Sequence, residues 1–293
     1  MHYRTGTILV MTAGFLWSWQ ALIIRHIEVA SPWVVLTWRS LSMIPVLLLF
    51  LAWRKRGSPL PTILRSGQAG VIGGIGLVVA MGGAILAFQT TTIANAAFIF
   101  AASPFIAAIL GRLFLAERVA TRTWLAICLA ILGIFFMVND GLAAGALVGN
   151  IAAIMSAFGF AVFSVSLRWR KIEDSLPVAL IGAVFAVIAG GVASFYSGQS
   201  LNIPLSDIML CVLMGTVTMA CGMLLYSIGS RVVPSAELTL MSNTEVILAP
   251  FWVWLILGET ASITTLLGGM IVLSALLFNA FSGITKPATA TAL

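Results

Sequence analysis

The stretch "NTEVILAPFWVWLILGE" at residues 243–259 decides how the rest of the chain is interpreted. It is apolar enough to cross a bilayer, yet Glu245 lies near its start and Glu259 ends it. An ionised carboxylate at the centre of a membrane costs roughly 3 kcal/mol, so it needs a partner or a function. A similar stretch, "AASPFIAAILGRLFLAE" at 101–117, carries an acid only at its end. The pattern therefore occurs twice, and one copy has an additional acid inside it.

The composition of the whole chain indicates an integral membrane protein. Hydrophobic residues make up 61% of the sequence and charged residues 8%, whereas soluble domains have about 25% charged residues. The three cysteines lie inside apolar runs, and neither histidine has a partner at metal-ligand spacing. We therefore predict no disulfide framework, no metal site and no cofactor.

Long apolar segments separated by turn or charge signals predict an all-α membrane protein with ten transmembrane helices. Segments of this kind span a bilayer because every backbone polar group is satisfied within the helix. The predicted spans are residues 6–24, 33–52, 69–89, 93–115, 123–139, 146–167, 177–196, 207–228, 234–257 and 263–282.

The distribution of lysine and arginine predicts the orientation, because these residues favour cytoplasmic loops. With the N-terminus inside, thirteen of the fifteen basic residues fall on the cytoplasmic side. The exceptions are Arg25 in an outer loop and Arg39 inside the second span. We therefore predict that both termini are cytoplasmic. The net charge of +6 is then a topology signal, so no nucleic-acid partner is predicted.

The sequence also aligns with itself, which predicts an internal duplication. "GFLWSWQALIIRHIE" at 14–28 lies over "GFAVFSVSLRWRKIE" at 159–173, an offset of 145 that places Arg25 on Arg170. Near the end of each half the offset becomes 142, which places Glu117 on Glu259. Five spans per half is an odd number, so the halves insert in opposite directions. The predicted units are repeats at 1–142 and 143–285 and a cytoplasmic tail at 286–293.

The opening stretch resembles the signature helix of the drug/metabolite transporter superfamily, EamA type. In that family an acid is followed by an apolar helix that ends in a Gly-Glu-like pair, as Glu245 and "LGE" at 257–259 do here. The first copy has Pro104 and "LAE" at 115–117. A narrower resemblance is to the YddG-like exporters of aromatic amino acids. The proline usual after the acid is Val246 here, a departure that concerns the local helix geometry.

Two polar stripes are candidates for the walls of a substrate cavity. On the ninth span Glu237, Met241 and Glu245 are four residues apart and share a face. Polar stripes on apolar helices are typical of cavity walls, although the same groups can satisfy one another inside a packed bundle. At the offset of 142 residues the first half has a second stripe: Asn95, Ile99 and Ser103.

Arg39 in "LTWRSLS" lies about six residues inside the second span. In one interpretation its partner is an anion inside the membrane. That anion is either Glu245, with which it would form a charge pair, or the carboxylate of a substrate. The other has its long side chain reach back to the outer interface. The sequence leaves both interpretations open.

The resemblance implies that further residues surround the central cavity, on the helices that the family places there. Flat apolar walls would suit aromatic ligands, although Phe residues facing lipid are equally common. These predicted substrate-contacting residues are Trp17, Gln20, Phe88, Phe98, Phe163, Met223 and Tyr226.

The function expected from these observations is a secondary transporter that exports amino acids, with aromatic or large apolar side chains favoured, by alternating access. Several rivals lack their required residues. A small multidrug pump needs an acid on the first helix, where Gln20 stands; a nucleotide-sugar carrier needs intramembrane lysines; a membrane enzyme needs a catalytic constellation. We therefore predict that the chain is not an enzyme.

Export of another small metabolite or drug, and proton-coupled antiport through Glu245, remain open alternatives. The expected setting is a bacterial-type inner membrane with the lipid bilayer around a monomer or weak dimer. The expected partner is a small-molecule substrate.

Overall fold

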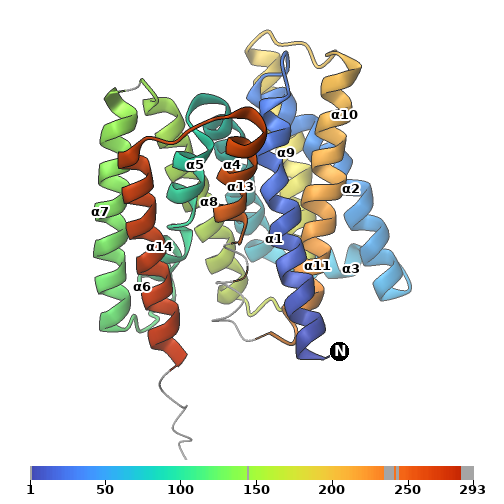
Figure 1. The fold of residues 1–293 in the computed structure, drawn as a ribbon. Coiled ribbons are helices and arrows are strands. Elements are labelled where there is room, and N and C mark those ends of the chain that lie inside the picture. Colours follow the sequence, from blue (N-terminus) through green and yellow to red (C-terminus); the bar gives the residue numbers. More distant parts are fainter. Residues whose placement is uncertain (1, 144, 234–240, 242–243, 285–293) are drawn as a thin grey trace, which may run out of the picture.

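The computed structural model describes the chain except for residues 1, 144, 234–240, 242–243 and 285–293 (Figure 1). Throughout the described residues the regular structure is helical, with no β-strand. The elements are α1 (Tyr3–Arg25), α2 (Pro32–Lys55), α3 (Leu60–Arg65), α4 (Gly67–Thr90), α5 (Ile93–Phe100), α6 (Ser103–Leu115), α7 (Thr121–Ala143), α8 (Leu147–Trp169), α9 (Leu176–Tyr196), α10 (Leu205–Leu213), the π-helix η1 (Met214–Cys221), α11 (Gly222–Gly229), α13 (Thr244–Leu257) and α14 (Ile263–Ile284).

Nine helical stretches in the described residues are long and apolar enough to cross a membrane. They correspond to nine of the ten predicted spans. The remaining span, predicted at 234–257, begins in residues outside the described part of the structure, and its described portion is the shorter apolar helix α13. The structure thus supports an all-helical membrane protein, while the number of ten spans stays a prediction.

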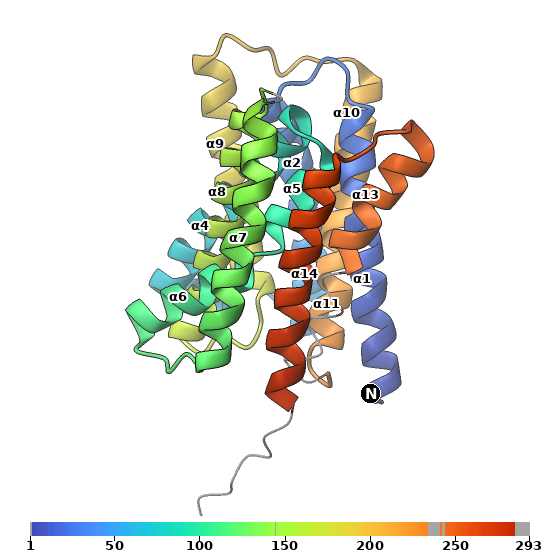
Figure 2. The same ribbon diagram turned by 60° about the vertical axis from the view of Figure 1, so that its left-hand side comes forward.

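The helices form one upright bundle with two ends (Figures 1 and 2). We call the end at which α1 begins the N-terminal face and the other end the opposite face. α1 runs from the N-terminal face to the opposite face, and α8, the first long helix of the second half, runs the other way (Figure 1). This antiparallel relation is the one that an inverted repeat requires. Which face lies in the cytoplasm stays a prediction.

The fourth predicted span, 93–115, is long and apolar enough to cross a membrane, but it consists of two helices. α5 ends at Phe100 and α6 begins at Ser103, with Ala101 and Ala102 between them. Pro104 lies in the first turn of α6, where its missing N–H would have no partner in the helix. The eighth span is also irregular, because the π-helix η1 separates α10 from α11.

Close contact between α4 and α8 joins the two halves. A Cβ added at Gly76 would lie 2.7 Å from the carbonyl oxygen of Gly159, and one at Gly83 would lie 2.7 Å from that of Ala152. No larger residue fits there unless the helices separate. The glycine-rich third span, in which Gly73, Gly74 and Gly76 are all buried, therefore serves close helix packing.

Candidate functional site

A cavity of about 350 Å³ lies between helices of the two halves. The first half contributes residues from α1, α2, α4, α5 and α6, and the second half contributes residues from α8, η1, α11 and α13. The lining extends from Ile24 and Phe88, in the last turns of α1 and α4, to Ser175 in the connection before α9. The cavity therefore runs along the bundle between its two ends. A volume of this size suits a small organic molecule.

Both helix irregularities lie on this cavity. Ala101, at the break between α5 and α6, lines it, and so does Met219 in η1. Interruptions of the regular α-helix at membrane depth are tolerated where they border a cavity or are buried in protein. Discontinuous helices of this kind commonly form the substrate sites of secondary transporters.

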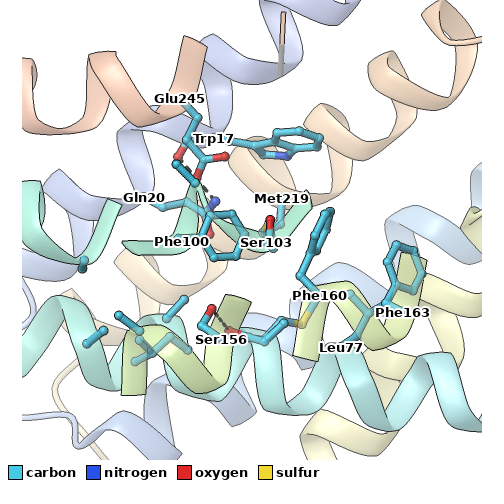
Figure 3. A pocket seen from close by; sticks show the side chains of 18 of the residues that line it. Trp17, Gln20, Leu77, Phe100, Ser103, Ser156, Phe160, Phe163, Met219 and Glu245 are labelled. Atoms are coloured by element: carbon cyan, nitrogen blue, oxygen red, sulfur yellow. Dashed lines mark hydrogen bonds between the residues drawn. The ribbon is translucent and has the colours of Figure 1, made fainter. Parts of the chain in front are cut away.

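The polar part of the cavity centres on Gln20 and Arg39. Arg39 projects from α2, is only 2% exposed, and donates from Nη1 to Oε1 of Gln20 at 3.2 Å. Its Nε and Nη2 atoms are buried without a hydrogen-bond partner. Glu245, in the first turn of α13, lines the same cavity and lies beside Gln20 and Trp17 in Figure 3. The cavity thus contains one basic and one acidic side chain.

Arg39 and Glu245 do not form the ion pair that the sequence suggested. Among the described residues, no carboxylate lies within 4.0 Å of the Arg39 guanidinium. Nη1 of Arg39 donates instead to the amide oxygen of Gln20. The alternative in which Arg39 reaches the outer interface is also excluded by its burial, because a side chain at the interface would be exposed.

The apolar part of the cavity is built of aromatic rings and methionines. The Trp17 ring lies 5.6 Å from that of Tyr226, and the Phe160 ring lies 5.7 Å from those of both Phe100 and Phe163. Gly222 in α11 makes room for the Trp17 indole, because a Cβ there would lie 2.4 Å from Nε1. Further apolar walls come from Leu77, Met81, Phe88, Met219 and Met223.

The structure brings most of the sequence-predicted residues to this cavity. Those that line it are Trp17, Gln20, Arg39, Phe88, Ser103, Phe163, Met223, Tyr226 and Glu245. Met241 is not among the lining residues, and Glu237 lies outside the described part of the chain.

Three residues of the first half face elsewhere. Asn95 donates to Asn150 of α8 and to Thr91, so it ties α5 to its neighbours. The ring of Phe98 packs against Gly269 of α14, and Ile99 lines a separate apolar cavity of about 80 Å³. The residues of this span that line the main cavity include Ala96, Phe100, Ser103 and Ala107, a helical stripe one residue on from Asn95 and Ile99. Of the predicted stripe of the first half, only Ser103 therefore lines the main cavity.

An ion pair lies beyond the cavity at the opposite face. Arg25, the last residue of α1, places Nη2 2.9 Å from Oε2 of Glu259. The same nitrogen donates to the carbonyl oxygen of Thr91 at 2.9 Å, and Glu259 accepts from the backbone N–H of Ile93 at 2.8 Å. The pair thus joins the end of α1 and the second residue after α13 to the start of α5.

A second ion pair lies at the N-terminal face. Arg168, near the end of α8, places Nη1 2.7 Å from Oε2 of Glu117, and its Nη2 donates to the carbonyl oxygen of Ala107 at 2.9 Å. In both pairs an arginine from the first helix of one half meets the glutamate that follows the fourth span of the other half. Sequence alignment assigned Arg170 to this place, but Arg170 stacks on Trp169 at 4.8 Å. An offset of 143, between the two offsets noted above, would have found Arg168.

A comparison with protein families now identifies the architecture. The model of the EamA-like transporter family matches twice, at residues 4–139 and 144–281. The chain belongs to the EamA-like transporter family. Its members are membrane transporters of the drug/metabolite type and not enzymes, so the chain is assigned to multi-pass transporters of small molecules.

A solved structure titled "Crystal structure of protein" has a similar fold, with a TM-score of 0.66. It is 15% identical in sequence, and the similarity covers 97% of this chain and 100% of that chain. At this identity the match supports the fold alone. None of the curated proteins compared with the chain matches it.

Proposed function

We propose that this protein is a secondary transporter that exports amino acids, with aromatic or large apolar side chains favoured, from a bacterial-type inner membrane. The observation that carries the proposal is the character of the cavity. It combines one basic and one acidic side chain with walls of aromatic rings and methionines. An amino acid with an apolar side chain has the same division between a charged head and an apolar body.

The two ion pairs supply a physical basis for alternating access. Each pair links elements of both halves at one end of the cavity, so each can close that end. In this structure the pair at the opposite face also binds two backbone groups of the turn that leads into α5. Both pairs are formed in this structure, and transport would proceed as one pair breaks while the other stays formed.

An exporter must release its substrate as well as bind it, so a low affinity is expected. A dissociation constant on the order of 1 mM corresponds to about −4 kcal/mol.

A second candidate function is proton-coupled antiport, and Glu245 is the observation that favours it. This carboxylate lines the cavity and has no ion-pair partner among the described residues. An intramembrane carboxylate is a common proton carrier. The substrate would then be an amino acid or another small metabolite or drug.

Uptake of radiolabelled amino acids into proteoliposomes, with and without a pH gradient, tests both candidates. We expect phenylalanine, tryptophan and methionine to be carried and lysine and glutamate to be excluded. Trp17→Ala should change the preference among large side chains more than it changes the transport of small amino acids. Equal transport of lysine and phenylalanine, or of neither, would contradict the aromatic preference. A pH response that disappears only in Glu245→Gln would establish the antiporter.

A further inference from the structure

The charged groups of the cavity carry a more specific assignment, which rests on the proposed function. A buried guanidinium without a nearby anion is unfavourable, because burial removes its hydration and nothing replaces the lost interaction. Arg39 is in this situation: it is 2% exposed, makes one hydrogen bond to Gln20, and leaves Nε and Nη2 without partners. An anionic group that enters the cavity would supply the missing charge.

Glu245 lines the same cavity and, as an anion, needs a cationic partner. Its carboxylate lies beside Gln20 and Trp17 in Figure 3, while Phe160 and Phe163 lie farther down the cavity. The amide of Gln20 accepts from Arg39, so it keeps the guanidinium at the wall between α1 and α2. Acid and base therefore line the same cavity, and among the described residues no ion pair joins them.

We propose that Arg39 receives the carboxylate and Glu245 receives the ammonium group of one zwitterionic substrate molecule, whose side chain lies against the aromatic walls. A zwitterion compensates both charges at once. A molecule with only an amine would leave Arg39 without an anion, and one with only a carboxylate would leave Glu245 without a cation. A site that pairs with a polar group discriminates strongly against analogues that lack it. The pair of residues thus selects amino acids over their decarboxylated and deaminated analogues.

The test compares three ligands with the same phenyl side chain. The detergent-purified full-length chain is titrated with L-phenylalanine, phenethylamine and 3-phenylpropanoate, and binding is measured as the rise in unfolding temperature with ligand concentration. We expect each analogue to bind at least tenfold more weakly than phenylalanine, which corresponds to about 1.4 kcal/mol.

Two variants should shift this preference in opposite ways. Arg39→Gln should abolish the preference for phenylalanine over phenethylamine and keep the preference over 3-phenylpropanoate. Glu245→Gln should do the reverse. Arg54→Gln is the matched control, because Arg54 lies on the same helix, pairs with Asp174 at 3.1 Å and does not line the cavity. If Arg39→Gln does not fold, Arg39→Lys keeps the charge and should keep the preference for phenylalanine over phenethylamine.

Each outcome decides the assignment. Crossed loss of selectivity in the two variants supports it. Equal binding of all three ligands by the unmodified protein overturns it and leaves amino-acid export standing. Variants that weaken all three ligands equally show a purely structural role and also overturn it. If none of the three ligands binds, the proposed amino-acid function fails together with the assignment.

Discussion

The ion pairs at the two ends of the bundle are built alike but are shielded to different extents. Arg25 and Glu259 have side chains that are 24% and 23% exposed, whereas Arg168 and Glu117 are 41% and 36% exposed. In the more buried pair, both side chains also hydrogen-bond to backbone groups: Arg25 to the carbonyl of Thr91 and Glu259 to the N–H of Ile93. In the more exposed pair, Arg168 donates to the backbone carbonyl of Ala107.

This difference matters because burial sets the strength of an ion pair. Exposed pairs contribute about 0–1 kcal/mol, and loss of one partner from a buried pair costs about 3–5 kcal/mol. The contribution of the pair of Arg25 with Glu259 to stability is expected to lie between these limits. It should exceed the contribution of the pair of Arg168 with Glu117. We infer that the structure represents a state in which the opposite face is the more firmly closed.

The largest expected effect is in the test of which side of the membrane each pair faces. A reporter lies either in the cytoplasm or outside, so the result is all or none. A reporter fused after Lys286 should lie in the cytoplasm, and one fused after Asp140 should lie outside. The physical reason is the concentration of lysine and arginine in the loops of the N-terminal face. If both reporters fall on the same side of the membrane, the predicted inverted insertion of the two halves is wrong.

Glu259→Gln should lower the free energy of unfolding by about 2 kcal/mol, measured by denaturation in detergent. The substitution leaves Arg25 half-buried without its anion and weakens the contact to Ile93. Glu28→Gln is the control, because Glu28 is an exposed carboxylate near the same face. An equal loss in the control would mean that the pair itself contributes nothing.

Arg168→Gln should cost less, at most about 1 kcal/mol, because its pair is more exposed. Double-mutant cycles on both pairs measure the difference directly. We expect the coupling between Arg25 and Glu259 to exceed that between Arg168 and Glu117. A larger coupling in the second pair would reverse the ranking of the two ends.

The smallest expected effect on stability comes from substitutions in the turns that precede Glu117 and Glu259. Ala116 in "LAE" has φ +54° and Gly258 in "LGE" has φ +68°, a conformation that disfavours residues with a Cβ. Gly258→Ala should therefore destabilise the protein by about 1 kcal/mol. Ala116→Gly should stabilise it by about 0.5 kcal/mol, since relief of strain is partly offset by entropy of the unfolded chain. Melting curves of both variants test the pair; shifts of the same sign would contradict the argument.

Much of the fold could be predicted from the sequence because the bilayer imposes strong rules. Apolar length, loop charge and self-similarity each depend on a single property of many residues. The break between α5 and α6 was missed because no residue between them is polar or glycine. Pro104 was noticed for its place in the pattern, but a proline in the first turn of a helix does not reveal where the preceding helix stops.

The candidate site was predicted less completely, because it depends on the direction of each side chain. Glu245 and Arg39 stood out as charges inside apolar spans, and both line the cavity. Asn95 and Ile99 were assigned to the cavity by alignment with the second half, but the stripe that faces the cavity is the neighbouring one with Ala96 and Phe100. Met81, Phe100, Ser156, Phe160 and Met219 line the cavity without having been singled out, because such residues are common throughout the sequence.

Each ion pair takes its arginine from one half of the chain and its glutamate from the other, across 234 residues in one case and 51 in the other. A half produced alone would therefore contain an arginine and a glutamate that belong to different pairs at opposite ends of the bundle. Two identical copies of such a half, inserted in opposite directions, would complete both pairs between subunits. In a single chain the two halves are covalently linked, so one sequence no longer has to insert into the membrane in both directions. The halves can then diverge in sequence, which allows the ion pairs at the two ends to differ in strength.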